Sequence, residues 1–195
     1  MRIFLAGASG VIGRHLVPLL VGEGHTVAGM TRTPGKVDWL RDVGAEPIVC
    51  DVFERDTLLR VMADFSPELV VHQLTDLPND PAEVRKQALA NRRMRREGTT
   101  NLVDAASTCG ARMIAQSVAW SLPGDDAEAV EFLERTVLGA GGVVVRYGQF
   151  YGPDTYYQDA PPGPPRIRID EAARLTVMSL GVQSGIVDVF ESMGA

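Results

Sequence analysis

Residues 1–14 read MRIFLAGASGVIGR, and this stretch decides the fold of the chain. Residues 2–6 form a short apolar run that predicts a buried strand. Three glycines follow at a constant spacing, at Gly7, Gly10 and Gly13. Apolar residues then recur at helical spacing, at Ile12, Leu16, Leu19 and Leu20. A strand, a tight glycine turn and an amphipathic helix, in that order, are the context that a phosphate-binding loop requires.

The glycines of this turn have separate physical roles: Gly7 permits a backbone turn that a side chain would block. Gly10 lets backbone N–H groups approach a pyrophosphate, and Gly13 lets the helix pack closely on the strand. The start of the helix adds unpaired N–H donors and the positive end of the helix dipole. A plain glycine-rich turn without a ligand is the alternative. We expect a dinucleotide to bind here, through Gly7, Ala8, Ser9, Gly10, Val11, Ile12 and Gly13.

The composition is that of a globular protein. The chain has 195 residues, 45% of them hydrophobic and 23% charged, so we expect one domain over residues 1–195. Its formal net charge of −6 argues against nucleic acid as a partner, because phosphate binding needs a basic surface. No apolar run approaches the roughly eighteen residues that span a bilayer, so no membrane partner is expected. Cys50 and Cys109 fit small core residues in a reducing cytoplasm, and the three histidines show no metal-ligand spacing.

Apolar runs and helical patterns alternate along the whole chain. This alternation, with near-continuous apolar runs such as ELVVHQL at residues 68–74, is typical of a parallel sheet with helices on both faces. We expect strands at residues 2–6, 25–30, 46–50, 68–74, 111–116, 142–146 and 185–190. We expect helices after the first turn and at residues 36–43, 54–65, 81–109, 125–138 and 170–180. The fold class is therefore α/β, a doubly wound parallel sheet in a single domain.

Three motifs carry a resemblance to a known family. They are the GxxGxxG spacing of the first turn, QSVAW at residues 116–120 and RYGQFYGP at residues 146–153. Together they resemble the atypical and extended members of the short-chain dehydrogenase/reductase superfamily, the NAD-dependent epimerase/dehydratases. The resemblance covers residues 1–153 well and residues 166–190 loosely. It implies a Rossmann fold and a nicotinamide cofactor.

The ends of the next strands carry the residues expected to select and hold this cofactor. In a Rossmann fold an acid after the second strand binds the 2′-hydroxyl of the adenosine ribose, whereas an arginine accommodates a 2′-phosphate. This chain has Arg32 there and no acid, which favours NADP over NAD, although a solvated arginine in a turn is the plainer interpretation. The resemblance implies that Asp51, followed by Val52, contacts the adenine, unless Asp51 simply begins a turn. Leu74 and Thr75 follow the fourth strand and are expected beside the nicotinamide ribose.

The catalytic pair of the family is missing from this chain. Reductases and epimerases of the superfamily use a Tyr four residues before a Lys, and the lysine lowers the pKa of the tyrosine. The two lysines of the chain, Lys36 and Lys86, have no tyrosine four residues before them. Alignment with the family's helix ending places Asp126 where the tyrosine belongs and Val130 where the lysine belongs. An apolar residue there cannot depress a neighbour's pKa by charge.

Three residues remain as candidates for catalysis. The resemblance implies that Ser117, at a strand end, hydrogen-bonds the reacting oxygen of the substrate; the alternative is a serine that starts a loop. Tyr147 and Tyr151 are the nearby phenols that would replace the lost acid, with packing and loop closure as their alternative roles.

The late part of the chain predicts a shortened substrate region. Residues 154–165, DTYYQDAPPGPP, form a Pro/Gly-rich connector where extended relatives carry a substrate domain. The resemblance also implies that the helix over residues 81–109 contributes to a homodimer and that Asn91 has a structural role. The charged run at residues 92–96 is expected to be a solvated helix face.

These observations predict an NADP(H)-binding protein, an atypical oxidoreductase or epimerase acting on a small carbonyl or hydroxyl metabolite. Two alternatives stay open: a non-redox isomerase, cyclase or lyase on the same scaffold, and a catalytically silent dinucleotide-binding or sensor protein. The missing lysine favours the alternatives, whereas the glycine turn, Arg32 and Ser117 favour retained cofactor binding. Fold does not settle chemistry.

Overall fold

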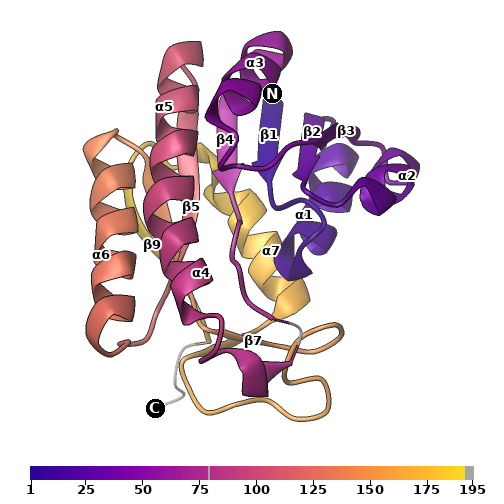
Figure 1. Ribbon diagram of the computed structural model, residues 1–195. Coiled ribbons are helices and arrows are strands. Elements are labelled where there is room, and N and C mark those ends of the chain that lie inside the picture. Colours follow the sequence, from indigo (N-terminus) through magenta and orange to yellow (C-terminus); the bar gives the residue numbers. More distant parts are fainter. Residues whose placement is uncertain (79, 192–195) are drawn as a thin grey trace.

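A computed structural model of the protein describes residues 1–78 and 80–191. Its centre is a parallel sheet of seven strands, in the spatial order β3-β2-β1-β4-β5-β6-β9 (Figure 1). The strands are β1 (Arg2–Ala6), β2 (Thr26–Thr31), β3 (Glu46–Val49), β4 (Leu69–His72), β5 (Arg112–Val118), β6 (Val143–Tyr147) and β9 (Gly185–Val189). Every neighbouring pair is parallel. The predicted doubly wound α/β fold is confirmed: β1 to β3 are added toward one edge of the sheet and β4 onward toward the other, so the strand order reverses between β1 and β4.

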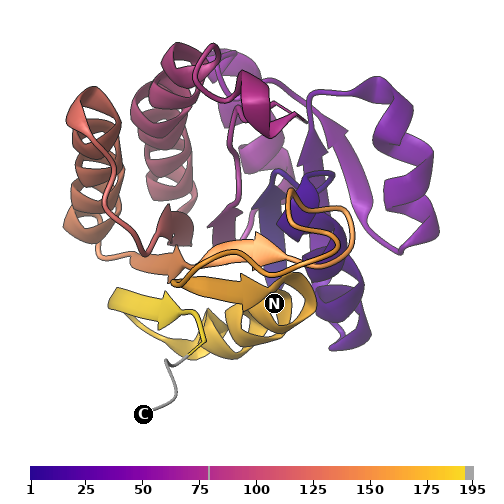
Figure 2. The same ribbon diagram turned by 90° about the horizontal axis from the view of Figure 1, so that it is seen from below.

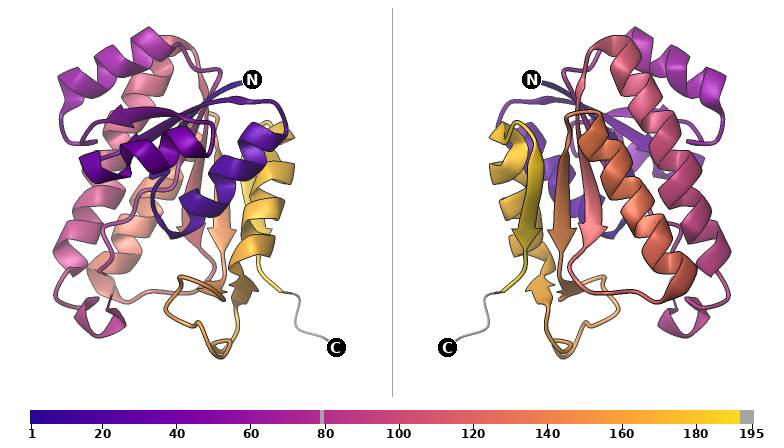
Figure 3. Two further views of the ribbon diagram at one scale, coloured as in Figure 1. Left: turned by 90° about the vertical axis from the view of Figure 1, so that its right-hand side faces the viewer. Right: turned by 90° about the vertical axis from the view of Figure 1, so that its left-hand side faces the viewer.

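Helices cover both faces of the sheet (Figure 3). One face carries α1 (Val11–Gly22), α2 (Val37–Asp42) and α7 (Ile169–Met178). The other face carries α3 (Arg55–Phe65), α5 (Thr99–Cys109) and α6 (Gly124–Gly139). Because side chains alternate along a strand, the five inner strands contribute to two separate core clusters, one under each helix layer, whereas the edge strands β3 and β9 contribute to one cluster each. The sheet is apolar on both sides for this reason, and all four residues of β4 are buried.

The helix predicted over residues 81–109 is shorter and less regular than expected. A 3₁₀ turn, η2 (Pro81–Glu83), is separated by further turns from α4 (Ala88–Arg93). The chain then passes through a wide π segment, η3 (Met94–Gly98), into α5. A Cβ on Gly98 would lie 2.8 Å from the sulfur of Met94, so a larger residue at that point would require the flexible Met94 side chain to move. Two further short 3₁₀ turns occur at η1 (Pro34–Lys36) and η4 (Ser179–Gly181).

The apolar face of α1 also differs in one position from the sequence prediction. Leu19 is exposed, whereas Val17 is fully buried beside Leu16 and Leu20. The helical period places residue 17 next to residues 13 and 20, on the face that packs against the sheet and α7, and turns residue 19 outward.

A second, smaller sheet was not predicted. It pairs β7 (Gln149–Tyr151) with β8 (Arg166–Arg168), and residues 152–165 run between them as a loop along the carboxyl edge of the main sheet (Figure 2). The Tyr156 hydroxyl donates a hydrogen bond to the carbonyl of Pro78, which joins this loop to the segment after β4. Three-residue strands are too short to show alternation in the sequence. Among the described residues, no helix has both the length and the hydropathy needed to cross a membrane.

Candidate functional site

The predicted site residues gather at the carboxyl edge of the main sheet. The glycine turn follows β1, Arg32 follows β2, Asp51 follows β3, and Leu74 and Thr75 follow β4. Ser117 is the penultimate residue of β5, whereas the sequence predicts that the strand stops at residue 116. Ligands of open α/β sheets bind at this edge, where the strand order reverses. A hollow lined by Arg2, Glu46 and Phe65 lies at the opposite, amino edge and contains none of these residues.

The glycines of the first turn are required by close backbone contacts. Gly7 has φ +91°, and a Cβ there would lie 2.8 Å from the carbonyl oxygen of Gln73. A Cβ on Gly13 would lie 2.2 Å from the carbonyl oxygen of Gly7, closer than any real contact. Gly10 is less restricted, because a Cβ added there would lie 3.2 Å from the carbonyl oxygen of Gly7. The turn therefore brings β1, α1 and the end of β4 together with no space for side chains between them.

The first turn of α1 leaves its amides available. The first hydrogen bond of the helix runs from the Arg14 N–H to the carbonyl of Gly10, at 3.0 Å. In the part of the chain that the structure describes, no side chain caps this end and no acid lies in its first turn. The N–H groups of residues 11–13 therefore remain as donors at the positive end of the helix dipole. Ala8 and Ile12 are buried, so they face a ligand only through their backbone.

Arg32 is held by an ion pair that the sequence did not predict. Its Nη2 lies 2.6 Å from Oδ1 of Asp76, and this hydrogen bond raises the pKa of Arg32 more than burial lowers it. The Asp76 N–H in turn donates to Oδ1 of Asn91, at 3.2 Å. Asn91 is buried on α4, in agreement with the structural role implied for it. Nearby, the Ser9 and Thr31 hydroxyls share a hydrogen bond of 2.8 Å.

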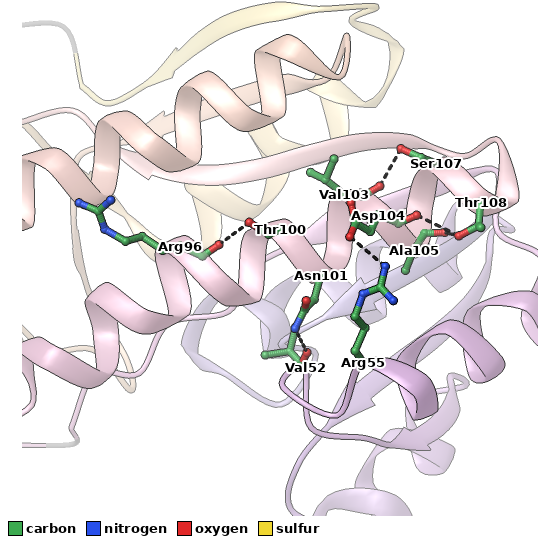
Figure 4. A network of polar contacts seen from close by, with 10 residues as sticks. All are labelled: Val52, Arg55, Arg96, Thr100, Asn101, Val103, Asp104, Ala105, Ser107 and Thr108. Carbon is green, nitrogen blue, oxygen red and sulfur yellow. Dashed lines mark hydrogen bonds and ion pairs between the residues drawn. The ribbon is translucent and has the colours of Figure 1, made fainter.

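The loop after β3 is fixed by side chains of its own and of α5. Oδ1 of Asp51 accepts the N–H of Phe53 at 3.0 Å, so the turn that was the alternative role of Asp51 is present. The Asn101 amide donates to the carbonyl of Val52 at 3.0 Å (Figure 4). Arg55 and Asp104 form an ion pair beside it, at 3.1 Å. These contacts set the position of Asp51 relative to the sheet.

The end of β4 is organised by a buried histidine. The Leu74 N–H donates to Nδ1 of His72 at 3.2 Å, so the proton of the neutral ring is on Nε2, which faces the Thr99 hydroxyl at 3.1 Å. Burial lowers the pKa of His72 to about 4. The Gln116 amide donates to the carbonyl of Leu74 at 3.1 Å, while Thr75 is exposed. His72 therefore shapes the strand end as a neutral core residue.

Ser117 belongs to a charged network that the sequence did not reveal. Its hydroxyl donates to Oε1 of Glu134 on α6, at 2.6 Å. Arg146 of β6 binds both oxygens of the same carboxylate, at 2.9 and 2.5 Å. Burial would raise the pKa of Glu134, but the hydrogen bonds from Arg146 and Ser117 outweigh it and lower that pKa. Because the Ser117 hydroxyl donates its hydrogen bond to Glu134, only its oxygen lone pairs are available, and it can act toward a further partner only as an acceptor.

Tyr147 lies on the opposite face of the sheet from Ser117. The Thr176 hydroxyl donates to the carbonyl of Ala172, so the Tyr147 hydroxyl must donate to Thr176, at 2.6 Å, and accept from Nε2 of Gln73, at 3.2 Å. Tyr147 is 2% exposed, and burial raises its pKa to about 12, although the bonds to Thr176 and Gln73 oppose this. A phenol in this state is a poor proton donor and acceptor near neutral pH.

The amide oxygen of Gln73 is the unpartnered end of this chain of hydrogen bonds. It is buried and has no hydrogen-bond partner among the described residues. The direction of the bonds from Gln73 through Tyr147 to Thr176 fixes which end of the amide is the oxygen. A buried acceptor without a hydrogen-bond partner lowers the stability of the folded protein by about 1–3 kcal/mol. The carboxyl edge next to Gly7 therefore favours a ligand that donates a hydrogen bond to this oxygen.

Tyr151 is separate from both other catalytic candidates. It lies in β7, and its hydroxyl donates to Oε1 of Glu191 at 2.5 Å, a bond that is the main cause of its raised pKa. Arg166 binds the other oxygen of Glu191, at 3.0 Å. The structure therefore does not bring Ser117, Tyr147 and Tyr151 into one group, and their catalytic roles stay predictions.

The position aligned with the family's tyrosine has taken a different role. Asp126 lies in the first turn of α6 and binds Nε of Arg92 at 2.6 Å, while Asp125 binds Nη1 of the same guanidinium at 2.6 Å. This places an ion pair between α4 and α6 where a proton relay is expected. Within residues 1–78 and 80–191, no three His, Cys, Asp or Glu side chains form a group suited to a metal ion.

Comparison with known proteins places these observations in a family context. Residues 3–139 match the sequence model of the NAD dependent epimerase/dehydratase family. A 3-diazoavenalumate denitrifying reductase of a Streptomyces species is 37% identical, over 80% of this chain and 59% of that protein. The photosystem II assembly factor Ycf39 of Cyanophora paradoxa is 30% identical, over 54% of this chain and 30% of that protein. The chain thus spans well under two thirds of the length of these relatives.

Solved structures of similar fold include a UDP-glucose 4-epimerase and an NAD-bound enzyme, both at low sequence identity. The Thermotoga maritima UDP-glucose 4-epimerase, solved with UDP-glucose, has a TM-score of 0.80 and 18% identity, covering 100% of this chain and 78% of that one. The Bordetella bronchiseptica enzyme WbmH, solved with NAD+, has a TM-score of 0.76 and 18% identity, covering 98% and 76%. At this identity the likeness extends to the fold.

Proposed function

Because this chain belongs to the NAD dependent epimerase/dehydratase family, we propose that it binds a nicotinamide dinucleotide at the carboxyl edge of its sheet and acts as an oxidoreductase or epimerase on a small metabolite. The observation that carries the proposal is the first turn of α1, with its amides of residues 11–13 and no capping side chain. The close contacts at Gly7 and Gly13 support it, because they serve a turn into which only backbone fits.

Each part of a dinucleotide has candidate residues at this edge. The α1 amides would hold the pyrophosphate. Arg32 would hold a 2′-phosphate, which makes NADP the proposed cofactor and NAD the alternative, and Asp51 would contact the adenine. Leu74 and Thr75 would lie beside the nicotinamide ribose. The unpartnered oxygen of Gln73 suits a donor such as a carboxamide N–H. A bound reduced nicotinamide supplies a hydride.

The side chains favour a substrate that needs no proton from a tyrosine. Tyr147 is committed to Thr176 and Gln73 in the core, which supports packing as its role. The Ser117 hydroxyl donates its hydrogen bond to Glu134. It is therefore suited to accept a hydrogen bond from a substrate hydroxyl, and not to polarise a carbonyl by donating one. A diazonium carbon that gains a hydride loses dinitrogen and becomes C–H, and this exchange requires no proton. The Streptomyces relative named for a diazo substrate supports this class.

Two other candidates keep specific support. A non-redox isomerase, cyclase or lyase, or a silent dinucleotide-binding protein, is favoured by the ion pair of Arg92 with Asp126 at the position aligned with the family's tyrosine.

A homodimer is proposed from the family resemblance. Leu89 on α4 is 76% exposed, and a partner subunit would cover it. A cytoplasmic location is proposed from the two free thiols, Cys50 and Cys109.

Binding of NADPH and NADH is the first test. We expect both to bind, NADPH more tightly, and Arg32→Glu to reverse this order, because an acid accepts the 2′-hydroxyl and repels a 2′-phosphate. Nicotinamide fluorescence and calorimetry measure both affinities. Arg41→Glu is the matched control, since Arg41 is an exposed arginine paired with Asp38 on α2, away from the strand ends. Equal affinities in the wild type would contradict the NADP assignment, and no heat with either nucleotide would contradict the whole proposal.

Turnover is the second test. With NADPH, we expect hydrogen-for-dinitrogen exchange on 4-(hydroxymethyl)benzenediazonium, which carries a hydroxyl for Ser117 to accept from, above the rate without protein, and little reduction in a panel of ketones and aldehydes. Chromatography measures benzyl alcohol, and absorbance measures NADPH. Ser117→Ala should raise KM more than it lowers kcat, because the serine holds the substrate without moving a proton. Ketone reduction that Ser117→Ala abolishes would favour the carbonyl chemistry instead, and turnover without NADPH loss would favour the isomerase class.

A further inference from the structure

We propose that Asp76 sets the cofactor preference of this site by competing with a 2′-phosphate for Arg32. The inference rests on the proposed dinucleotide site and concerns a residue to which neither the family match nor the fold assigns a role. Arg32 and Asp76 follow β2 and β4, the two neighbours of β1. Their ion pair therefore bridges the end of β1, where the glycine turn begins.

The carboxylate occupies the part of the guanidinium that binds phosphate. Nη2 of Arg32 lies 2.6 Å from Oδ1 of Asp76, and Nη1 lies 3.5 Å from Oδ2. A phosphate can use the same pair of parallel N–H donors, which is one of the two bidentate edges of arginine. One guanidinium cannot present both donors to the two anions at once. A 2′-phosphate must therefore displace Asp76 or share Arg32 with it.

Arg32 is the partner that can move. Its side chain is 56% exposed, whereas the Asp76 side chain is 17% exposed. The backbone of Asp76 is held by the buried Asn91, through the N–H of residue 76. Asp76 therefore remains at this edge when Arg32 turns toward a ligand, and its charge then lies close to an incoming phosphate.

The local charge also reduces the advantage of a nucleotide that carries a 2′-phosphate. Asp51 acts on Arg32 as a second negative charge. Asp76 is paired with Arg32 and Asp51 adds a longer-range negative charge, so a phosphate that carries two further negative charges meets a site in which carboxylates outnumber the guanidinium. The neutral 2′-hydroxyl of NAD does not meet this repulsion. Asp76 thus lowers the advantage that Arg32 alone would give to NADP.

The test is the ratio of the NADP+ and NAD+ affinities, measured by calorimetry on the full chain. Asp76→Asn keeps the shape of the side chain and the backbone bond to Asn91, and removes the charge. We expect this ratio to rise about tenfold in favour of NADP+, equivalent to about 1.4 kcal/mol, with the NAD+ affinity changed less than about threefold. Asp38→Asn is the matched control, because it removes an exposed carboxylate from another Arg–Asp pair and should leave the ratio unchanged.

A second background separates competition from general repulsion. In Arg32→Ala, the Asp76→Asn change should alter the ratio less than about threefold, because the contested guanidinium is gone. An unchanged or lowered ratio in Asp76→Asn would overturn the inference, a lowered one meaning that Asp76 orients Arg32 for the phosphate. An undiminished effect in Arg32→Ala would also overturn it. Tight binding of both nucleotides with an unaffected ratio would leave the dinucleotide site intact and remove this inference alone, whereas no binding by any variant would remove both.

Discussion

Gly13→Ala is expected to weaken dinucleotide binding by about 100-fold or more and to lower the free energy of unfolding by about 1–3 kcal/mol. A Cβ at this position would lie 2.2 Å from the Gly7 carbonyl oxygen and 2.7 Å from that of Ala8. Both contacts are with backbone, so a rotamer change cannot relieve them. The turn and the first turn of α1 must move apart, and the amides of residues 11–13 lose their common direction. Calorimetry with NADPH and urea unfolding measure the two effects.

Gly22→Ala provides the control on the same helix. Gly22 is the last residue of α1, and a Cβ there would meet nothing within 4 Å. Alanine at this position should leave binding unchanged and stabilise the protein by about 0.5–1 kcal/mol, because it reduces the entropy of the unfolded chain. A Gly13→Ala protein that binds NADPH as the wild type does would show that the pyrophosphate lies elsewhere.

Acidification from about pH 6.5 to about pH 4 is expected to cost about 3 kcal/mol of unfolding free energy through His72 alone. Burial lowers the pKa of this ring to about 4 in the folded protein, from an ordinary value of 6.5. Between these two pH values the unfolded chain binds a proton that the folded protein does not, so stability falls as the pH falls. The folded ring excludes the proton because the ring is fully buried, where a charged imidazolium is disfavoured. Above pH 6.5 the ring is neutral in both states and contributes no pH dependence.

Urea unfolding across this pH range, compared between the wild type and His72→Gln, isolates the contribution. Glutamine retains a donor and an acceptor for Thr99 and Leu74 but does not titrate. The variant should show a flatter fall of stability between pH 6.5 and pH 4, whatever its stability at neutral pH. Parallel curves for the two proteins would mean that His72 is accessible to protons in the folded state.

The features that local sequence determines were the ones that could be predicted. The glycine turn, the order of strands and helices, and the placement of Arg32 and Asp51 at strand ends all follow from patterns within a few residues. The fold is confirmed, and the glycine contacts have the physical cause expected for Gly7 and Gly13. Errors of one or two residues at the element ends, as at β5, arise because strand pairing rather than composition sets where a strand stops.

The partners of the site residues could not be predicted, because they come from distant segments. The sequence points to Ser117, yet Glu134, which accepts its hydrogen bond, and Arg146, which holds the Glu134 carboxylate, lie 17 and 29 positions later. Asp76 lies 44 residues after Arg32. A buried acid on an otherwise amphipathic helix is the signal that would have pointed to Glu134. Tyr147 is similar, because only the register of β6 shows that it faces α7 rather than Ser117.

The salt link between α4 and α6 has a consequence for any attempt to engineer a Tyr/Lys pair into this chain. Asp126→Tyr would remove the 2.6 Å contact at Nε of Arg92 and leave only the contact of Asp125 at Nη1, while Val130→Lys would place the lysine one turn further along the same helix. Installing the pair therefore requires a third substitution that replaces Arg92 or gives its guanidinium a new partner.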